Sequence, residues 1–178
     1  MPNPSSQLVA VNVVHELLRG PSRMTAIDKR PVAGPVRVGE LGLEGDMQCD
    51  TRHHGGPDQA LYAYAAEDAA WWAEALGRPI APGLFGENLT TDGLDITNAL
   101  IGERWRIGST VVVEVRSART PCTNFSARMG IPRFHKQFAA VGRLGAYLKV
   151  LTPGSVTAGD PIAIEYRPPD AATGGEGS

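Results

Sequence analysis

Cys122 is the residue whose surroundings most favour chemistry. It ends the run Arg119-Thr-Pro-Cys122, which follows a predicted strand directly, and loops at strand ends are where proteins commonly display reactive groups. Arg119 would favour the charged form of the thiol. Pro121 fixes its own backbone angle and restricts the residue before it, which presets the direction of the thiol. The pattern also allows a buried, inert cysteine.

A second polar group is the run Asp50-Thr-Arg52-His53-His54-Gly-Gly. The two glycines permit backbone geometries that present N–H groups to an anion. Neighbouring side chains in an extended chain point opposite ways, so only one of His53 and His54 should face a given pocket. A solvated turn is the alternative. A structural zinc site is disfavoured, because Cys49-x3-His53-His54 lacks a matching second pair of ligands.

Two shorter groups could support these residues. Glu87 could orient an arginine or a histidine, and Asn88 could hydrogen-bond a polar ring, although an ordinary turn would look the same. Lys29 and Arg30 place two cations before a proline, which is also the pattern of a solvated surface pair.

Hydrolase and nucleotide motifs are absent from the sequence. We find no Ser-His-Asp order, no G-x-S-x-G and no G-x-G-x-x-G. A thiol hydrolase that pairs Cys122 with His53, His54 or His135 remains open.

The elements that must position these residues are mostly short strands. Pattern and turn residues predict a mainly β, α+β fold, with a mixed, mostly antiparallel sheet that curls into a barrel. The predicted strands are 7–18, 24–27, 35–38, 61–64, 105–107, 110–115, 146–151 and 161–166. The predicted helices are 66–76 and 132–140, and the predicted polar loops are 42–58, 83–93 and 117–124.

Composition sets the outer bounds. A chain of 178 residues, 42% hydrophobic and 20% charged, predicts one globular domain over 1–167, followed by a flexible tail over 168–178. The net charge of −2 gives no bulk attraction to nucleic acid or to a membrane surface. Without a signal peptide or a long apolar run, we expect a cytoplasmic protein with reduced thiols, either monomeric or a homodimer.

In their order along the chain, the motifs resemble the MOSC domain family, and most of all its stand-alone bacterial hydroxylaminopurine-resistance type. The resemblance spans about Thr25 to Ile164. The motifs that carry it are Lys29-x-Pro-Val, Gly42-x-x-Gly-Asp46, Asp50-x-Arg-His-His-Gly-Gly56, Phe85-Gly-Glu-Asn-Leu-Thr90, Ile101-Gly…Arg106-Ile-Gly108, Arg119-x-Pro-Cys122, Gly142-Arg-x-Gly-x-Tyr147 and Gly159-Asp160.

The resemblance implies a barrel-like fold that binds a molybdenum cofactor, with Cys122 ligating molybdenum or carrying sulfur. Thiolate is a soft ligand that suits such a metal. The implied cofactor-binding residues, several of them cations for the pterin phosphate, are Lys29, Arg30, Asp50, Arg52, His54, Asn88, Arg119 and Cys122. The implied catalytic residues are Cys122, His53 and His54, the histidines as proton relays.

The resemblance favours reduction of N-hydroxylated compounds, such as hydroxylaminopurine-like bases and amidoximes. Two cysteines are too few for an iron–sulfur cluster, and no dinucleotide motif is present, so a separate electron-donor protein is predicted. The alternatives are a sulfur carrier or cofactor-handling protein with a persulfide on Cys122, and a binding module whose ancestral site is empty.

Overall fold

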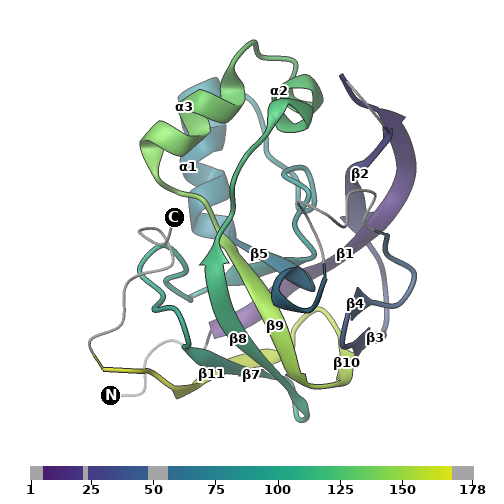
Figure 1. Ribbon diagram of the computed structural model, residues 1–178, viewed down its shortest axis with the longest axis vertical. Helices are drawn as coiled ribbons and strands as arrows, with labels where there is room; N and C mark the ends of the chain where they lie inside the picture. Colours follow the sequence, from purple (N-terminus) through teal and green to yellow (C-terminus); the bar gives the residue numbers. More distant parts are fainter. Residues whose placement is uncertain (1–5, 22–23, 48–55, 170–178) are drawn as a thin grey trace.

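Seven strands close into a barrel in the computed structural model, which describes residues 6–21, 24–47 and 56–169 (Figure 1). The barrel closes because the first strand pairs with both the sixth and the last, joining the two edges of the sheet. In order around the barrel the strands are β11 (Pro161–Tyr166), β7 (Arg104–Ile107), β8 (Val111–Ala118), β9 (Ala146–Thr152), β5 (Leu61–Ala65), β6 (Leu89–Asp92) and β1 (Ser6–Arg19). All neighbours are antiparallel except β5 and β6.

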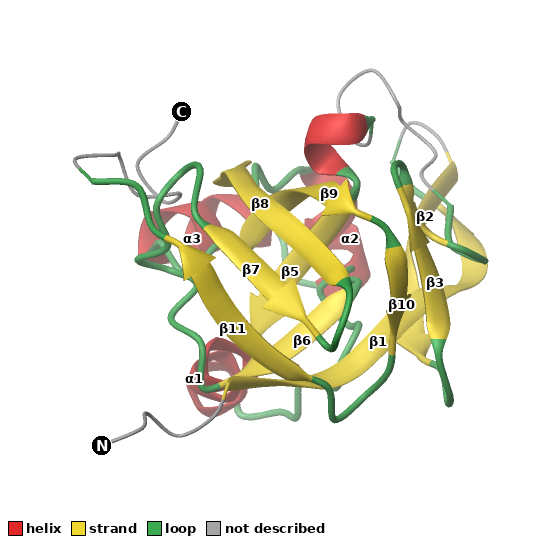
Figure 2. Ribbon diagram, turned by 90° about the horizontal axis from the view of Figure 1, so that it is seen from below, coloured by secondary structure: helices red, strands yellow, loops and turns green. Residues whose placement is uncertain are grey.

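The remaining elements surround the barrel. Strand β2 (Met24–Pro31) pairs with the far half of β1, and a small sheet contains β10 (Gly154–Val156), β3 (Val36–Gly39) and β4 (Gly42–Leu43). A 3-10 turn spans Pro57–Gln59. The helices are α1 (Ala66–Leu76), α2 (Thr123–Met129) and α3 (Phe134–Val141). Figure 2 shows them outside the barrel wall. None of the described helices is long and apolar enough to cross a membrane.

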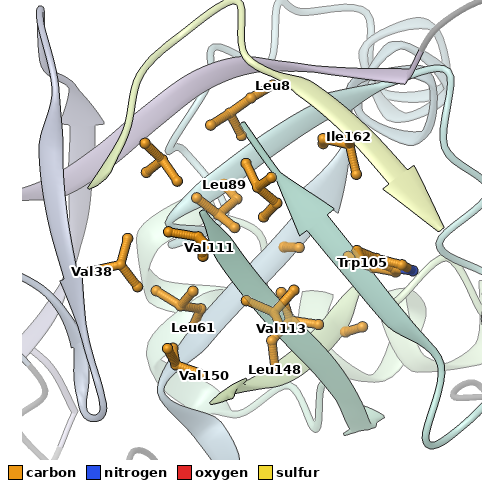
Figure 3. Close-up of a cluster of buried hydrophobic side chains, with 14 of the residues drawn as sticks. Leu8, Val38, Leu61, Leu89, Trp105, Val111, Val113, Leu148, Val150 and Ile162 are labelled. Carbon is orange, nitrogen blue, oxygen red and sulfur yellow. The ribbon is translucent and has the colours of Figure 1, made fainter. Parts of the chain in front are cut away.

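Strand β5 separates two hydrophobic cores. Its successive residues point to opposite faces, so Leu61 and Ala63 enter the barrel while Tyr62 and Tyr64 face the helices. All five residues of β5 are buried, because both of its faces are covered. The barrel interior is filled largely by aliphatic side chains such as Val113 (Figure 3).

The second core is an aromatic layer between the barrel and the helices. Phe85, Phe125, Phe134 and Phe138 lie in mutual ring contact, with Trp72 stacked on Phe138 at 5.7 Å between ring centroids. Such ring pairs add to the free energy gained by burial. This layer lies directly beneath the loop that ends in Cys122, because Phe125 is on α2.

Mainly β architecture, barrel closure and most elements confirm the sequence prediction, but two predicted loops were wrong. Region 83–93 contains β6, four residues that are too short to show an alternating pattern; they form a strand because β5 and β1 offer partners on both sides. Region 117–124 contains the end of β8 and the start of α2. Nothing in the sequence marks that start, because the residue before α2 makes no side-chain capping bond.

Three smaller differences concern β2, β10 and the tail. Strand β2 runs on to Pro31, so Lys29 and Arg30 lie in a strand. The short strand β10 was not predicted. The last strand ends at Tyr166, and residues 170–178 lie outside the described part, so the boundary of the tail stays a prediction.

Gly145 allows β9 to approach β5, and we predict that Gly145→Ala is strongly destabilising. Its φ is +74°, and an added Cβ would lie 2.6 Å from the Ala63 carbonyl oxygen and 2.6 Å from Tyr62 Cε1. Backbone strain and overpacking together should lower the free energy of unfolding by about 3 kcal/mol, measured by urea denaturation.

Gly130→Ala is the matched control. Gly130 has a similar φ of +67° with nothing within 4 Å of an added Cβ, so only the backbone cost of about 1 kcal/mol is expected. Equal losses in both variants would show that close packing at Gly145 is unimportant.

Candidate functional site

Cys122 lies at the junction of β8 and α2. Its backbone is extended, with φ −132° and ψ 179°, and it is the residue immediately before α2. The Cys122 carbonyl accepts a hydrogen bond from the Phe125 amide at 3.0 Å, which ties the residue to the first turn of the helix. The side chain is half-buried. A thiol in this setting is both held in place and reachable, as the sequence context predicted.

Arg119 lies in the protein interior behind Cys122, with only 8% of its surface exposed. Its Nη1 donates a hydrogen bond to the Phe85 carbonyl oxygen. Its guanidinium lies 4.3 Å from the ring centroid of Phe125 and 4.8 Å from that of Tyr62. Arginine stacks well on aromatic faces because guanidinium is planar and weakly hydrated. The Arg119 cation is therefore part of the aromatic layer.

The charge of Arg119 survives this burial. Burial alone lowers the pKa of the guanidinium, but the negative charges that Tyr62, Tyr147 and Cys122 carry when ionised, together with a hydrogen bond to Tyr62, raise it, with a net rise. The tyrosines respond in turn: burial raises the pKa of Tyr62 and of Tyr147, although Arg119 opposes the rise. Both phenols stay protonated at neutral pH. Arg119 thus directs a permanent positive charge towards Cys122.

A second buried cluster contains Lys29, Asp46 and Asn88. The Lys29 ammonium donates to both carboxylate oxygens of Asp46, at 2.8 and 3.0 Å. The same carboxylate accepts from Asn88 Nδ2 at 2.8 Å and from the Val14 amide at 2.9 Å. A buried ion pair is tolerated only when its remaining polar atoms are also bonded, and this pair meets that condition.

Asn88 fixes the loop 83–88 to the barrel. Its side-chain oxygen accepts from the Tyr62 backbone amide at 3.0 Å. Its backbone amide donates to the Tyr62 carbonyl oxygen at 2.8 Å, and its backbone carbonyl accepts from the Asn12 backbone amide at 2.7 Å. At the other end of the loop, a Cβ on Gly83 would lie 2.3 Å from the Lys29 carbonyl oxygen. The loop thus contacts β1, β2 and β5 at once, and through Phe85 it also contacts Arg119.

Glu87 is a buried carboxyl group within this loop, 2% exposed. Its Oε2 accepts from Thr90 Oγ1 at 2.9 Å, while Oε1 is buried with no hydrogen-bond partner. Burial raises the pKa of Glu87, and it outweighs the opposing hydrogen bonds and the charge of Arg119. The neutral acid is favoured because an ionised oxygen without a donor is costly in the interior.

Asp28 connects β2 to α2. Its carboxylate is buried and accepts from Arg128 on α2 at 3.1 Å and from Arg30 at 3.2 Å. The helix that begins after Cys122 is thereby anchored to the strand that carries Lys29. Because Arg30 is largely exposed, its guanidinium also faces solvent beside this junction.

Five of the predicted site residues lie in the described part: Lys29, Arg30, Asn88, Arg119 and Cys122. The structure groups them around the loop 83–88, Lys29 with Asn88 and Arg119 with Cys122. Asp50, Arg52, His53 and His54, together with Cys49, fall within 48–55, outside the described residues. Which of the nine predicted site residues, a set that leaves out Cys49, contact a cofactor or act in catalysis stays a prediction.

Sequence reasoning missed two further residues at the site. Asp46 appeared only as part of a motif, although a buried lysine requires such a carboxylate. Asn124 lies two residues beyond Cys122, and its buried Oδ1 has no hydrogen-bond partner in the part of the chain that the structure describes. No pattern in the sequence could have singled out Asn124, because its position depends on the unpredicted helix α2.

Comparison with known proteins gives a family. The MOSC domain family matches residues 50–163. Among curated proteins, the chain is 38% identical over 143 residues to the uncharacterized protein YflK of Bacillus subtilis (strain 168) and 36% identical over 150 residues to protein YiiM of Escherichia coli (strain K12). These matches cover 80% and 82% of the chain, which spans only 64% and 66% of the two relatives.

A fungal protein and a solved structure extend the comparison. A protein named "Reductase" from Gibberella moniliformis is 33% identical over 147 residues, 81% of this chain but only 26% of that protein. The crystal structure of YiiM from Geobacillus stearothermophilus superposes with a TM-score of 0.78 at 31% identity, covering 96% of this chain and 80% of that one.

We predict that Glu87→Gln changes how stability depends on pH. With its pKa raised in the folded state, wild-type Glu87 favours folding below its unfolded pKa, and this contribution is lost as the pH rises through the folded pKa. The variant, which cannot ionise, should gain stability relative to wild type as the pH rises from about 4.5, by at most about 1.4 kcal/mol per pH unit. Urea denaturation of both proteins across this range measures the difference, and a constant difference would contradict a neutral Glu87.

We also predict that Asp46→Asn is destabilising because of Lys29. Removing one partner of a buried ion pair costs about 3–5 kcal/mol, mostly from the charge left behind. Lys29→Met in the Asp46→Asn background removes that charge and should restore part of the loss. Denaturant titrations of the two single variants and the double variant give the coupling free energy. Strict additivity would mean that Lys29 does not depend on Asp46.

Proposed function

The chain belongs to the MOSC domain family, and from that premise we propose that it binds a molybdenum cofactor through Cys122 and reduces N-hydroxylated compounds. The single observation that carries the proposal is the half-buried Cys122 thiol at the junction of β8 and α2, with the buried cation of Arg119 behind it. A fixed positive charge beside a reachable thiol favours the thiolate, which is the form that binds a metal.

The chemistry of the donor groups fits such a cofactor. Thiolate sulfur is a soft ligand suited to a thiophilic metal. Asn124 Oδ1, two residues further along the chain, is a buried acceptor without a donor among the described residues, and the N–H groups of a pterin ring could supply one. We propose that Asn124 is a cofactor-contacting residue of this site.

The structure suggests a division of labour among the predicted cofactor residues. Lys29 and Asn88 are bonded to Asp46, and Arg119 to Phe85 and the aromatic rings. We assign to these three the positioning of the site and its positive field. The exposed Arg30, with Asp50 and Arg52, is assigned to the phosphate-bearing side of the pterin, and His53 and His54 to proton delivery.

The proposed reaction consumes two electrons and two protons. An N-hydroxylated amine, R–NHOH, accepts the two electrons and the two protons. The N–O bond breaks, the oxygen leaves as water, and R–NH2 remains. When bound, the cofactor would supply two-electron redox chemistry for cleavage of the N–O bond. The chain's own residues orient the substrate, hold the protons and keep Cys122 in its direction.

The electrons are assigned to a separate donor protein. The similarity to a part of the fungal "Reductase" supports redox use of this domain, since that protein contains much additional chain outside the matched region. The two bacterial relatives are also longer than the matched region, so substrate range and partners of the whole protein belong to the proposal.

We predict that Cys122→Ser abolishes molybdenum retention. Protein made in a molybdenum-competent host should contain metal and pterin, and the variant should lose at least ten-fold in both, because a serine hydroxyl is a poor substitute for a soft thiolate. Metal analysis and the fluorescence of the oxidised pterin are the measurements. Cys49→Ser is the matched control and should keep both.

Full metal content in Cys122→Ser would exclude the ligand role. The activity is tested with loaded wild-type protein, reduced methyl viologen and 6-hydroxylaminopurine, with the aminopurine as the expected product. A persulfide on Cys122 without such turnover would instead favour the sulfur-carrier alternative.

A further inference from the structure

Acidic residues are unevenly distributed along this chain. It carries 19 aspartates and glutamates, yet none lies between Glu114 and Asp160. The same stretch contains seven cations: Arg116, Arg119, Arg128, Arg133, Lys136, Arg143 and Lys149. A protein with net charge −2 thus has a long segment whose Lys and Arg residues are not accompanied by any Asp or Glu, and that segment includes Cys122, α2 and α3. Segregated charge of this kind creates a local field that the net charge conceals.

The exposed cations of this segment are concentrated at the start of α3. Arg133 and Lys136 are exposed, three positions apart, while Phe134 and Phe138 face the aromatic layer. Neither cation forms an ion pair with another residue in the described part of the chain. The outer face of α3 continues with small or apolar exposed residues, ending in Val141, which is 37% exposed. We call this face, from Arg133 to Val141, the basic surface.

The basic surface adjoins the candidate site. Ser126, four residues beyond Cys122 and so about 6 Å along the α2 axis, bonds to His135 on α3 twice. Ser126 Oγ lies 2.7 Å from His135 Nδ1 and accepts from the His135 backbone amide at 2.8 Å. Figure 1 shows α2 and α3 at the same end of the molecule, beyond the end of β8. A body resting on α3 would therefore lie close to Cys122.

Two further features make this surface more than a solvated helix face. Among the residues that the structure describes, Arg133 is the only non-glycine in the left-handed region, with φ 59° and ψ 22°. An arginine there is strained in a way that glycine would avoid, although its side chain forms no ion pair with any other described residue. Nearby, Arg30 and Arg128 share the single carboxylate of Asp28, which leaves one positive charge in excess beside α2.

We propose that the basic surface docks an acidic electron-transfer protein, which delivers electrons to the site at Cys122. The proposal rests on the proposed function, because only a reductase needs such a donor. A flat helical face with exposed cations and a small apolar part fits a protein partner, since charge steers the encounter and the apolar area is buried on contact. Each docking event would oxidise the donor by one or two electrons and reduce the site by the same number.

The test measures binding of an acidic flavoprotein, flavodoxin, to the full-length protein. We expect the double variant Arg133→Glu/Lys136→Glu to bind flavodoxin at least ten-fold more weakly than wild type at an ionic strength of about 0.05 M. Wild-type binding should weaken as salt is added, because exposed charges are screened. This readout needs no bound cofactor.

The control variant is Arg104→Glu/Arg106→Glu on β7, which makes the same change in net charge. Figure 1 places β7 at the end of the molecule away from α2 and α3. These arginines are about half exposed and pair with Glu114 and Glu165, so the control faces like charges across the sheet and is used only if its urea denaturation shows a folded protein. The control should bind flavodoxin within about two-fold of wild type. Arg133→Gln/Lys136→Gln is a milder second variant and should give an intermediate loss.

The docking proposal and the proposed function fail separately. If wild type turns over the N-hydroxylated substrate with reduced methyl viologen, and the double variant does too but not with reduced flavodoxin, both stand. Equal flavodoxin binding by the double variant and the control overturns the docking proposal alone. Tighter binding of duplex DNA than of flavodoxin at equal salt would assign the surface to nucleic acid and also overturn it. Absence of viologen-driven turnover in loaded wild type overturns the proposed function instead.

Discussion

This end of the molecule is organised around the contacts of one buried cation, the guanidinium of Arg119. It lies against Tyr62 and Phe125 and bonds to the carbonyl of Phe85. Those three contacts join the barrel wall, the first turn of α2 and the loop 83–88. Without an ion pair among the described residues, its charge is balanced by aromatic faces, by a carbonyl dipole and by the nearby thiol. Packing and electrostatics therefore depend on the same residue, three positions before Cys122.

The cluster of Lys29, Asp46 and Asn88 stabilises its buried cation through an ion pair instead. The side chains of Lys29 and Asp46 are both buried, and their charged groups are fully bonded, because Asn88 and the Val14 amide also donate to the carboxylate. On β2, the strand that also carries Lys29, Asp28 accepts a hydrogen bond from Arg128 of α2. The adjacent residues Lys29 and Asp28 of β2 thus secure the loop on one side and the helix on the other, because successive side chains of a strand point to opposite faces. The candidate site is held from several elements, so its geometry does not rely on any single loop.

The sequence predicted what depends on local pattern. Richness in β-branched residues identified β1, the turn Gly108-Ser109 identified β8 as half of a hairpin, and the Ala-rich run closed by Gly77 identified α1. It failed where tertiary partners decide. Leu89 to Asp92 become a strand only because β1 and β5 flank them, and α2 begins at Thr123 without a capping side chain before it. Cys122 and Arg119 were found from their spacing, whereas Asp46 and Asn124 became visible only through their contacts or an unpaired oxygen.

Barrel closure has a consequence for the order of assembly. Ser6 pairs with Ile162 in the contact between β1 and β11, so the first strand cannot complete its hydrogen bonds until β11 has been synthesised. Pairings this distant in sequence form late, because the entropy of a long loop must be lost before any contact compensates for it. The loop 83–88 depends on β1 through Asn12. Any ligand of this site would therefore meet a closed barrel rather than an open sheet.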